Sequence, residues 1–197
     1  MPVAGTSKEP TVTQISPSKS QPSSSVQPTT KRNWVNLSDR VMLSFKEKND
    51  IQNDKKLCCN IIDFAQQLLQ QQFPSVNGLQ FTGYAPILEN TGKWTYSLQI
   101  TREIPPSVQI HHTGHAHWVL SIQDTSGTVF LLDSKNPRQT VSASTQIQMS
   151  RIYSSNGNVI PVNLPTVQQQ TNSIDCGVFA IAYATEFCFN QYTGGKG

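Results

Sequence analysis

Apolar side chains recur at helical spacing in the stretch Asn60–Gln72. They fall at positions i, i+4, i+7 and i+8 and make one stripe: Ile61, Ala65, Leu68 and Leu69. This period is typical of a helix with one buried face, and Pro74 marks its end. The pattern therefore predicts a first helix over Asn60–Gln72.

The middle of the chain changes to the composition of β-strands. Three short stretches are rich in β-branched and aromatic residues: Trp94–Ile100, Ala116–Gln123 and Thr128–Leu132. The last two are joined by Asp124–Gly127, whose residues favour a tight turn, so we predict a hairpin. A further strand is predicted over Val159–Leu164, and Pro161 confines it to an edge or a bulge.

A second helix is predicted over Cys176–Phe189. Asp175 is a suitable N-cap, and the apolar face consists of Val178, Ile181, Ala182 and Thr185. Helix, sheet and helix follow one another along the chain. This order indicates the α+β class.

Residues 1–32 differ in composition from the rest of the chain. Ser, Thr, Pro and Gln make up most of this segment, and it contains no aromatic residue. Such a segment cannot bury enough apolar surface to offset its ordering entropy. We therefore predict a disordered tail over 1–32 and one folded domain over 33–197, with Lys31-Arg32 as a solvated boundary rather than a nuclear localisation signal.

Charge and hydropathy exclude several functional classes. The 197 residues include 15 Lys and Arg against 12 Asp and Glu, a formal charge of +3, and no dense basic stripe lies beside aromatic residues. We therefore predict no nucleic-acid partner. No apolar run reaches the roughly 18 residues of a membrane span, and the N-terminus lacks the apolar centre of a signal peptide. Four cysteines without framework spacing favour a reducing compartment, the nucleus or cytoplasm, and we expect a monomer.

Cys176 is the candidate nucleophile. A free cysteine near pKa 8.5 is mostly protonated at neutral pH, so thiol chemistry needs a setting that favours the thiolate. The first turn of a helix offers unpaired backbone N–H groups and the positive end of the helix dipole. Cys176 holds such a position, and Gly177 beside it is expected to let a substrate carbonyl come close to the backbone.

A thiolate enzyme also needs a histidine, a group that orients it, and donors for the oxyanion. His117 lies inside one predicted strand, and Asp133 follows the next one, so both are expected at the open end of the hairpin. Gln170, six residues before Cys176, lies in the loop that enters the helix and can donate its side-chain amide.

These residues resemble a known family. His117-Trp118, then Asp133-Ser134 sixteen residues on, then Gln170 six residues before Cys176-Gly177, is similar to the sentrin/SUMO-specific, ubiquitin-like proteases. These belong to the papain-like clan that also includes the adenovirus protease. The stretch LCCNIIDFAQQLLQQQFPSVNGLQ is similar to a helix of invertebrate, often mobile-element-associated, members.

The resemblance implies a papain-like fold with a mostly antiparallel sheet packed against helices and the nucleophile at a helix N-terminus. It implies that His117 is the general base, Asp133 its orienting carboxylate, Gln170 the oxyanion donor and Cys176 the nucleophile. Trp118 is implied as a wall of the substrate channel. The expected activity is a cysteine protease that deconjugates a ubiquitin-like, SUMO-like modifier and needs no cofactor or metal; the modifier or its conjugates are the expected partners.

The chain departs from the family in two places. The family's Trp-Leu-x-Asp segment is replaced by Lys56-Leu57-Cys58-Cys59, and the chain ends at Gly197, before the further C-terminal structure of relatives, so we expect a truncated domain. Two other functions therefore stay open: a catalytically silent module that binds a ubiquitin-like protein, and a general endopeptidase of mobile-element origin.

The remaining cysteines and histidines receive structural interpretations. Cys58, Cys59 and Cys188 are expected to be buried small apolar residues. His111, His112 and His115 are expected at a loop or strand end, with His115 and His117 on one strand face. Since zinc sites need further ligands in a suitable spacing, no metal site is predicted.

Overall fold

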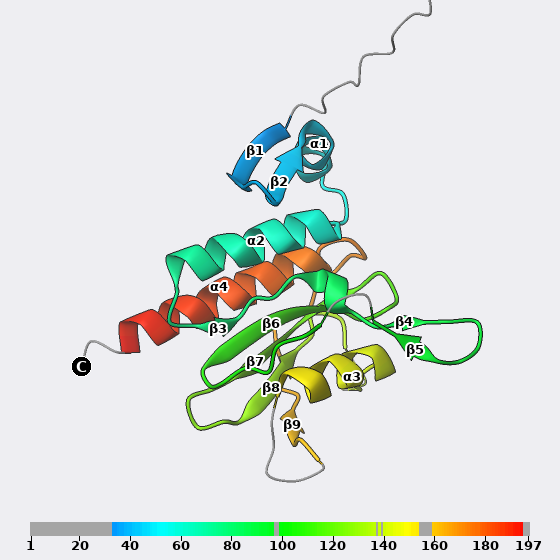
Figure 1. The fold of residues 1–197 in the computed structure, drawn as a ribbon, viewed down its shortest axis with the longest axis vertical. Coiled ribbons are helices and arrows are strands. Elements are labelled where there is room, and N and C mark those ends of the chain that lie inside the picture. The colour runs from blue at the N-terminus through cyan, green and yellow to red at the C-terminus, as the bar shows by residue number, and fades with distance from the viewer. Residues whose placement is uncertain (1–32, 97–98, 137, 139, 154–158, 195–197) are drawn as a thin grey trace, which may run out of the picture. The chain divides into compact units, whose positions relative to one another are not determined.

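Helices lie on both faces of a five-stranded sheet in the computed structural model, which describes residues 33–96, 99–136, 138, 140–153 and 159–194 (Figure 1). α2 (Cys59–Gln72) and α4 (Cys176–Gly194) lie side by side on one face, and α3 (Ala143–Ile152) lies on the other. This arrangement confirms the predicted α+β class. The predicted tail 1–32 lies outside the described residues.

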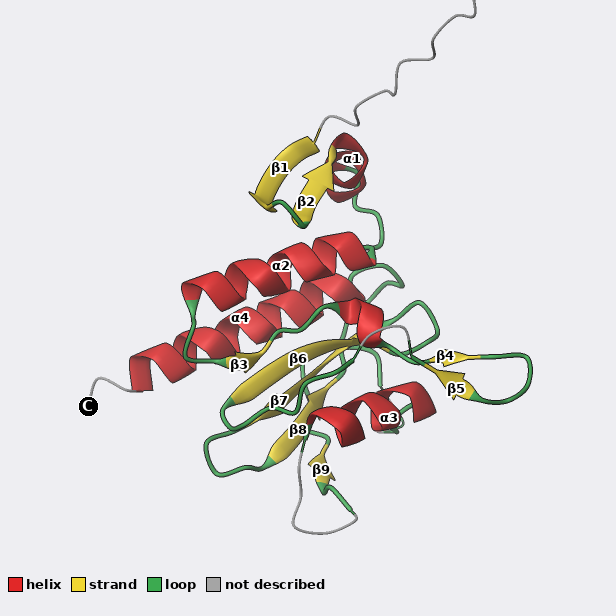
Figure 2. Cartoon of the chain, in the orientation of Figure 1, coloured by secondary structure: helices red, strands yellow, loops and turns green. Residues whose placement is uncertain are grey.

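The sheet has the strand order β3-β6-β7-β8-β9 (Figure 2). Its centre is antiparallel and consists of β6 (Ser107–His112), β7 (Trp118–Gln123) and β8 (Val129–Leu132). Each edge carries a two-residue parallel strand, β3 (Asn77–Gly78) beside β6 and β9 (Val162–Asn163) beside β8. The sheet is therefore mostly antiparallel, as expected.

The β7–β8 hairpin forms at the predicted turn. The Asp124 carboxylate accepts hydrogen bonds from the backbone N–H groups of Ser126 and Thr128, both at 2.9 Å. Gly127 has a φ of +86°, a conformation that glycine adopts without steric cost. Local turn chemistry thus sets the register in which Leu120 pairs with Leu132.

Alternate residues of the central strands face different helices, which gives two apolar cores. The core under α2 and α4 receives from the sheet Val108, Ile110, Trp118 and Leu120. The core under α3 contains Val119, Val129 and Leu131, packed with Met149 and Ile152. The sheet is therefore covered on both faces, and the helix that carries Cys176 packs against β6 and β7.

Both predicted helices are present, but Val178 and Ala182 of the apolar face predicted for α4 are exposed, and its buried face includes Ala180 and Ala184 instead.

Two predicted strands are much shorter than expected. Only β5 (Trp94–Thr95), paired with β4 (Ile87–Leu88), forms within Trp94–Ile100, of which residues 97–98 lie outside the described part. Val159–Leu164 is reduced to β9, which lies at the sheet edge and begins directly after Pro161. A proline cannot donate to a ladder, so the strand begins only after it.

Several elements give little sequence signal. The strand β6 carries glutamine and histidine on buried positions, and α3 is largely polar, although the Ser142 hydroxyl caps it by accepting from Thr145 N–H at 3.2 Å. The others precede the sheet or enter it: β1 (Asn33–Ser38), β2 (Val41–Ser44), α1 (Phe45–Gln52) and the 3-10 turn η1 (Thr82–Tyr84). Among the described residues, no helix is long and apolar enough to cross a membrane.

Candidate active site

Cys176 is the first residue of α4 and is buried. The carbonyl of Asp175 accepts the first helical hydrogen bond, from Phe179 N–H at 3.0 Å, so Asp175 occupies the N-cap position. Its carboxylate accepts from the Asn172 side-chain amide. The Cys176 thiol lies close enough to the His117 side chain and to the backbone N–H of Trp118 for both groups to favour the thiolate. The sulfur thus faces the β7 start from the N-terminal end of a helix.

His117 and Asp133 meet at the open end of the β7–β8 hairpin. His117 directly precedes β7, and Asp133 directly follows β8, so antiparallel pairing brings them together. His117 Nε2 lies 2.6 Å from Asp133 Oδ1. Because Nε2 is bound to the carboxylate, Nδ1 is the ring nitrogen left for Cys176.

His117 lies outside the strand in which the sequence placed it. The strand Ala116–Gln123 begins only at Trp118, because Gly114 and Ala116 have φ values of +86° and +53° and break the extended backbone. The Thr113 N–H donates to the His117 carbonyl at 2.9 Å and closes the loop. The expectation that His115 and His117 share a strand face is therefore wrong.

The surroundings of His117 and Cys176 favour the charged form of both side chains. Burial opposes a charged imidazole, but the hydrogen bonds of His117 with Asp133 and Cys176 outweigh it and raise its pKa to about 9. Burial also opposes a Cys176 thiolate, but hydrogen bonds from His117 and from Trp118 N–H outweigh it, so the thiol pKa is lowered. Both shifts favour a thiolate–imidazolium pair at neutral pH.

Gln170 lies in the loop before α4 and is bound to the end of β8. Its backbone N–H donates to the Ser134 carbonyl at 2.8 Å, and its Oε1 accepts from the Ser134 hydroxyl at 2.7 Å. Its Nε2 donates to the Asn172 carbonyl at 2.8 Å, so the amide has one N–H left. Gln169 instead donates to the Asp133 carbonyl at 3.2 Å. Ser134 was part of the sequence motif but received no role from it.

Trp118 is mostly buried and joins two segments of the site. Its ring N–H donates to the Leu57 carbonyl at 2.9 Å, and its ring contacts His112 edge-on, with centroids 4.8 Å apart. Trp118 and Leu57 also line a cavity of about 540 Å³, together with Lys56, Ala116 and residues of α2 and η1. Lys56 Nζ donates to the Ala116 carbonyl at 2.9 Å across the same two segments.

Gly177 has a packing role, and its expected role beside the substrate stays a prediction. It is buried, and a Cβ at this position would lie 3.0 Å from Leu57 Cβ and 3.3 Å from Ile62 Cδ1. The absence of a side chain therefore allows α4 to approach α2 and Leu57, which lies two residues before α2. The sequence showed that the residue is small, but not that Leu57 and Ile62 pack closely against it.

The other histidines differ in their surroundings. His111 is fully buried in β6, with Nδ1 3.0 Å from Gln148 Oε1 and Nε2 2.6 Å from the Ser121 hydroxyl. His112 is half-buried at the end of β6, and His115 is exposed in the following loop. Within the described part of the chain, no three His, Cys, Asp or Glu side chains form a group that could hold a metal ion.

The other three cysteines are only partly as expected. Cys188 is fully buried, as predicted, whereas Cys58 is half-buried and Cys59 is exposed. Cys59 is the first residue of α2, and its position at the helix start leaves the side chain in solvent.

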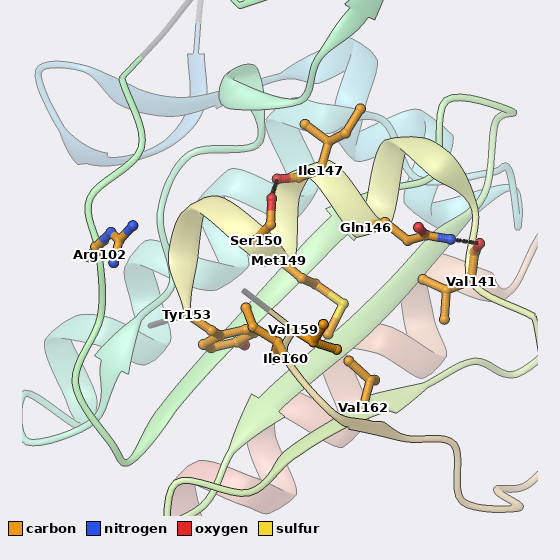
Figure 3. A pocket seen from close by; sticks show the side chains of 10 residues that line it. All are labelled: Arg102, Val141, Gln146, Ile147, Met149, Ser150, Tyr153, Val159, Ile160 and Val162. Atoms are coloured by element: carbon orange, nitrogen blue, oxygen red, sulfur yellow. Dashed lines mark hydrogen bonds between the residues drawn. The ribbon is translucent and has the colours of Figure 1, made fainter. Parts of the chain in front are cut away.

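The largest cavity described contains none of these site residues. It has a volume of about 640 Å³ and lies between α3 and the β9 segment (Figure 3). Its lining is mainly apolar and includes Met149, Tyr153, Ile160 and Val162. There Gln146 donates to the Val141 carbonyl and Ser150 donates to the Ile147 carbonyl, at 2.9 Å each (Figure 3).

Solved structures of SUMO proteases share this fold. The C-terminal Ulp1 protease domain in complex with Smt3, the yeast ortholog of SUMO, has a TM-score of 0.55 at 16% identity, over 78% of this chain and 75% of that one. Ulp1 with its catalytic cysteine oxidised to a sulfenic acid gives a TM-score of 0.56 at 15% identity, over 79% and 76%. A de-sumoylating protease gives 0.52 at 17%, over 77% and 70%. No family model and no curated protein matches the chain. In fold, this chain resembles the Ulp1-type SUMO proteases.

Proposed function

We propose that the chain is a cysteine peptidase that hydrolyses the peptide or isopeptide bond after the C-terminal glycine of a ubiquitin-like, SUMO-like modifier. The observation that carries this proposal is the Cys176–His117–Asp133 series, in which a helix-start thiol contacts an imidazole that is bound to a carboxylate at 2.6 Å. Such a series both activates a nucleophile and holds its base in one orientation.

The proposed reaction uses only groups of this chain and water. The Cys176 sulfur attacks the glycine carbonyl carbon, and the resulting oxyanion accepts hydrogen bonds from the Cys176 backbone N–H and the free N–H of Gln170. The C–N bond then breaks as His117 gives its proton to the leaving amine. Water, deprotonated by His117, attacks the thioester and releases the carboxylate and the thiol.

The substrate class is proposed from the shape of the site and from the neighbours. One cavity is lined by Ala116 and Trp118, the two sequence neighbours of His117, and by Leu57, whose carbonyl accepts a buried hydrogen bond from the Trp118 ring. One similar structure, Ulp1, is in complex with Smt3. A free thiol nucleophile requires reducing conditions, so we place the activity in the nucleus or cytoplasm.

The test is covalent labelling by SUMO, ubiquitin and related modifiers that carry a C-terminal electrophile. We expect one modifier to form an adduct, and peptide mapping should locate it on Cys176 rather than on the exposed Cys59. Cys176→Ala should abolish the adduct, and His117→Ala should slow it strongly. Binding of a modifier without any turnover would instead indicate a silent binding module, and cleavage of unfolded peptides alone would indicate a general endopeptidase.

A further inference from the structure

Lys56 lies where two segments that line the cavity meet, one with Lys56 and Leu57 and the other with Ala116 and Trp118. Its Nζ donates to the carbonyl of Ala116, which is sixty residues away in sequence and directly precedes His117. Both residues line the 540 Å³ cavity beside Trp118. A substrate tail that lies in this cavity therefore passes within reach of the Lys56 ammonium.

Two hydrogen bonds join these walls, and they differ in strength. The bond from Trp118 Nε1 to the Leu57 carbonyl is buried, so breaking it leaves a carbonyl without a partner and costs the desolvation of that group. The bond from Lys56 to Ala116 is exposed, and both groups can turn to water instead. Of these two donors, Lys56 is thus the one that can give up its hydrogen bond to Ala116 and bind a substrate group instead.

The charge around Lys56 is positive. An ammonium has three donors, of which Ala116 occupies one, and no described carboxylate lies within ion-pair distance of Lys56. Burial lowers the pKa of His112, and the nearby positive charges of His117, His115 and Lys56 lower it further. Among the described basic side chains at this end of the cavity, His117 is paired with Asp133, whereas Lys56 has no carboxylate partner.

The carboxylate in the cavity wall does not neutralise that charge at the rim. Asp63 is half-buried, and its Oδ1 accepts from the Thr82 backbone N–H at 2.7 Å. Its hydrogen bond is directed into the protein rather than toward Lys56. Among the described carboxylates, none therefore pairs with Lys56, and a bound ligand can supply one; the Cys176 thiolate also interacts with the Lys56 charge.

We propose that Lys56 is a specificity-determining residue that selects substrates with an acidic side chain in the tail before the cleaved glycine. The proposal rests on the proposed function and takes the substrate tail to lie in this cavity, whose lining includes both sequence neighbours of His117, Ala116 and Trp118. In the complex, the Lys56 ammonium leaves the Ala116 carbonyl or shares it and pairs with the substrate carboxylate. Complementary charge at such a site discriminates between substrates that are otherwise alike.

The test uses the full chain and three peptide series that end in Gly-Gly followed by a fluorogenic amine. The residues before the glycines carry an acidic, a neutral or a basic side chain. We expect kcat/KM for the acidic series to exceed that for the neutral series by about two- to fivefold, the value of an exposed ion pair. Lys56→Ala should remove the difference, and Lys56→Glu should reverse it in favour of the basic series.

Lys55→Ala is the matched control, because it removes the same charge one residue away. Lys55 lies 3.6 Å from Asp50 and does not line the cavity, so the preference for acidic tails should remain. The proposal would be overturned if kcat/KM did not depend on the charge of the peptide tail, either in the parent chain or in Lys56→Glu.

A binding measurement separates this proposal from the proposed function. Fluorescence anisotropy of the uncleaved peptides with Cys176→Ala reports tail preference without any chemistry. Acid-selective binding that depends on Lys56, without cleavage by the parent chain, would support the Lys56 assignment and contradict the peptidase. Equal affinity for the three tails, together with normal cleavage, would contradict Lys56 alone.

Discussion

Ser134 and Gln170 hold each other through two hydrogen bonds, from the Ser134 hydroxyl to Gln170 Oε1 at 2.7 Å and from the Gln170 backbone N–H to the Ser134 carbonyl at 2.8 Å. Because the hydroxyl donates, the amide oxygen is fixed on that side, and Nε2 must point away from Ser134. Ser134 follows Asp133, so one short segment orients both the imidazole and the amide.

Loss of the Gln170 amide should reduce turnover without affecting the nucleophile. If its free N–H binds the oxyanion, Gln170→Ala should lower kcat by about 10²–10³. Ser134→Ala should act through the orientation of the amide and lower kcat less, with little change in KM. Steady-state kinetics provide the measurement, and Gln168→Ala in the same glutamine run is the control. Unchanged kcat in Gln170→Ala would exclude this role.

Cys176 should react with iodoacetamide faster than the more exposed Cys59 at pH 7. Hydrogen bonds from His117 and Trp118 lower the pKa of Cys176 against the effect of burial, whereas burial and neighbouring charges raise that of Cys59. The Cys176 thiolate is lost as pH falls through its lowered pKa, and its imidazolium partner is lost as pH rises through about 9. Mass spectrometry of both alkylated cysteines across this pH range measures the difference in their reaction rates.

In His117→Ala, Cys176 should react at least about tenfold more slowly at pH 7. Equal rates of Cys176 alkylation in the parent chain and in His117→Ala would contradict the ion pair.

Gly177→Ala should destabilise the fold. The added Cβ would lie 3.0 Å from Leu57 Cβ, and α4 would have to move away from α2, so we expect a loss of about 1–3 kcal/mol. Urea unfolding measures this loss. Val178→Ala, at the exposed next position, should change stability far less. Equal stability of the two variants would show that the contact relaxes freely.

Stability should fall between pH 6.5 and pH 4 because of His111. Its burial lowers its pKa from 6.5 to about 4, although the Gln148 hydrogen bond opposes the shift. Between these values the unfolded chain binds the proton and the folded chain does not, so acid favours unfolding, by about 3 kcal/mol over the whole window. The contribution of His117 has the opposite sign and lies above pH 6.5, since its pKa is raised to about 9.

Urea unfolding at several pH values between 7 and 4 measures this effect. In His111→Gln the titrating group is gone, so the free energy of unfolding should depend less steeply on pH in this window, whatever its absolute value. A slope that is the same in both proteins would assign the acid sensitivity to other groups.

The sequence was sufficient where local rules decide the structure. The stripe from Ile61 to Leu69 predicted α2, and the turn Asp124–Gly127 predicted the hairpin at whose end His117 and Asp133 meet. In both cases the signal lies within a dozen residues. Periodicity and turn chemistry carry such signals well.

The sequence was not sufficient where distant segments decide it. The strand β6 buries Gln109 and His111, whose hydrogen-bond partners come from other elements, so its polar residues hid a buried strand. The bond between Lys56 and Ala116 joins residues sixty positions apart, and no local pattern announces it. Trp94–Ile100 has strand composition but pairs over only two residues, since composition does not specify a partner strand.

The two ends of the β7–β8 hairpin differ in how far they tolerate insertions and substitutions. The six residues of β7 separate His117 from the turn by about 20 Å, at about 3.3 Å per residue. A fluorophore, an affinity handle or an extra loop inserted between Asp124 and Gly127 would therefore leave the imidazole and its carboxylate in register. At the other end of the hairpin, a substitution of His117 or Asp133 would remove the contact itself.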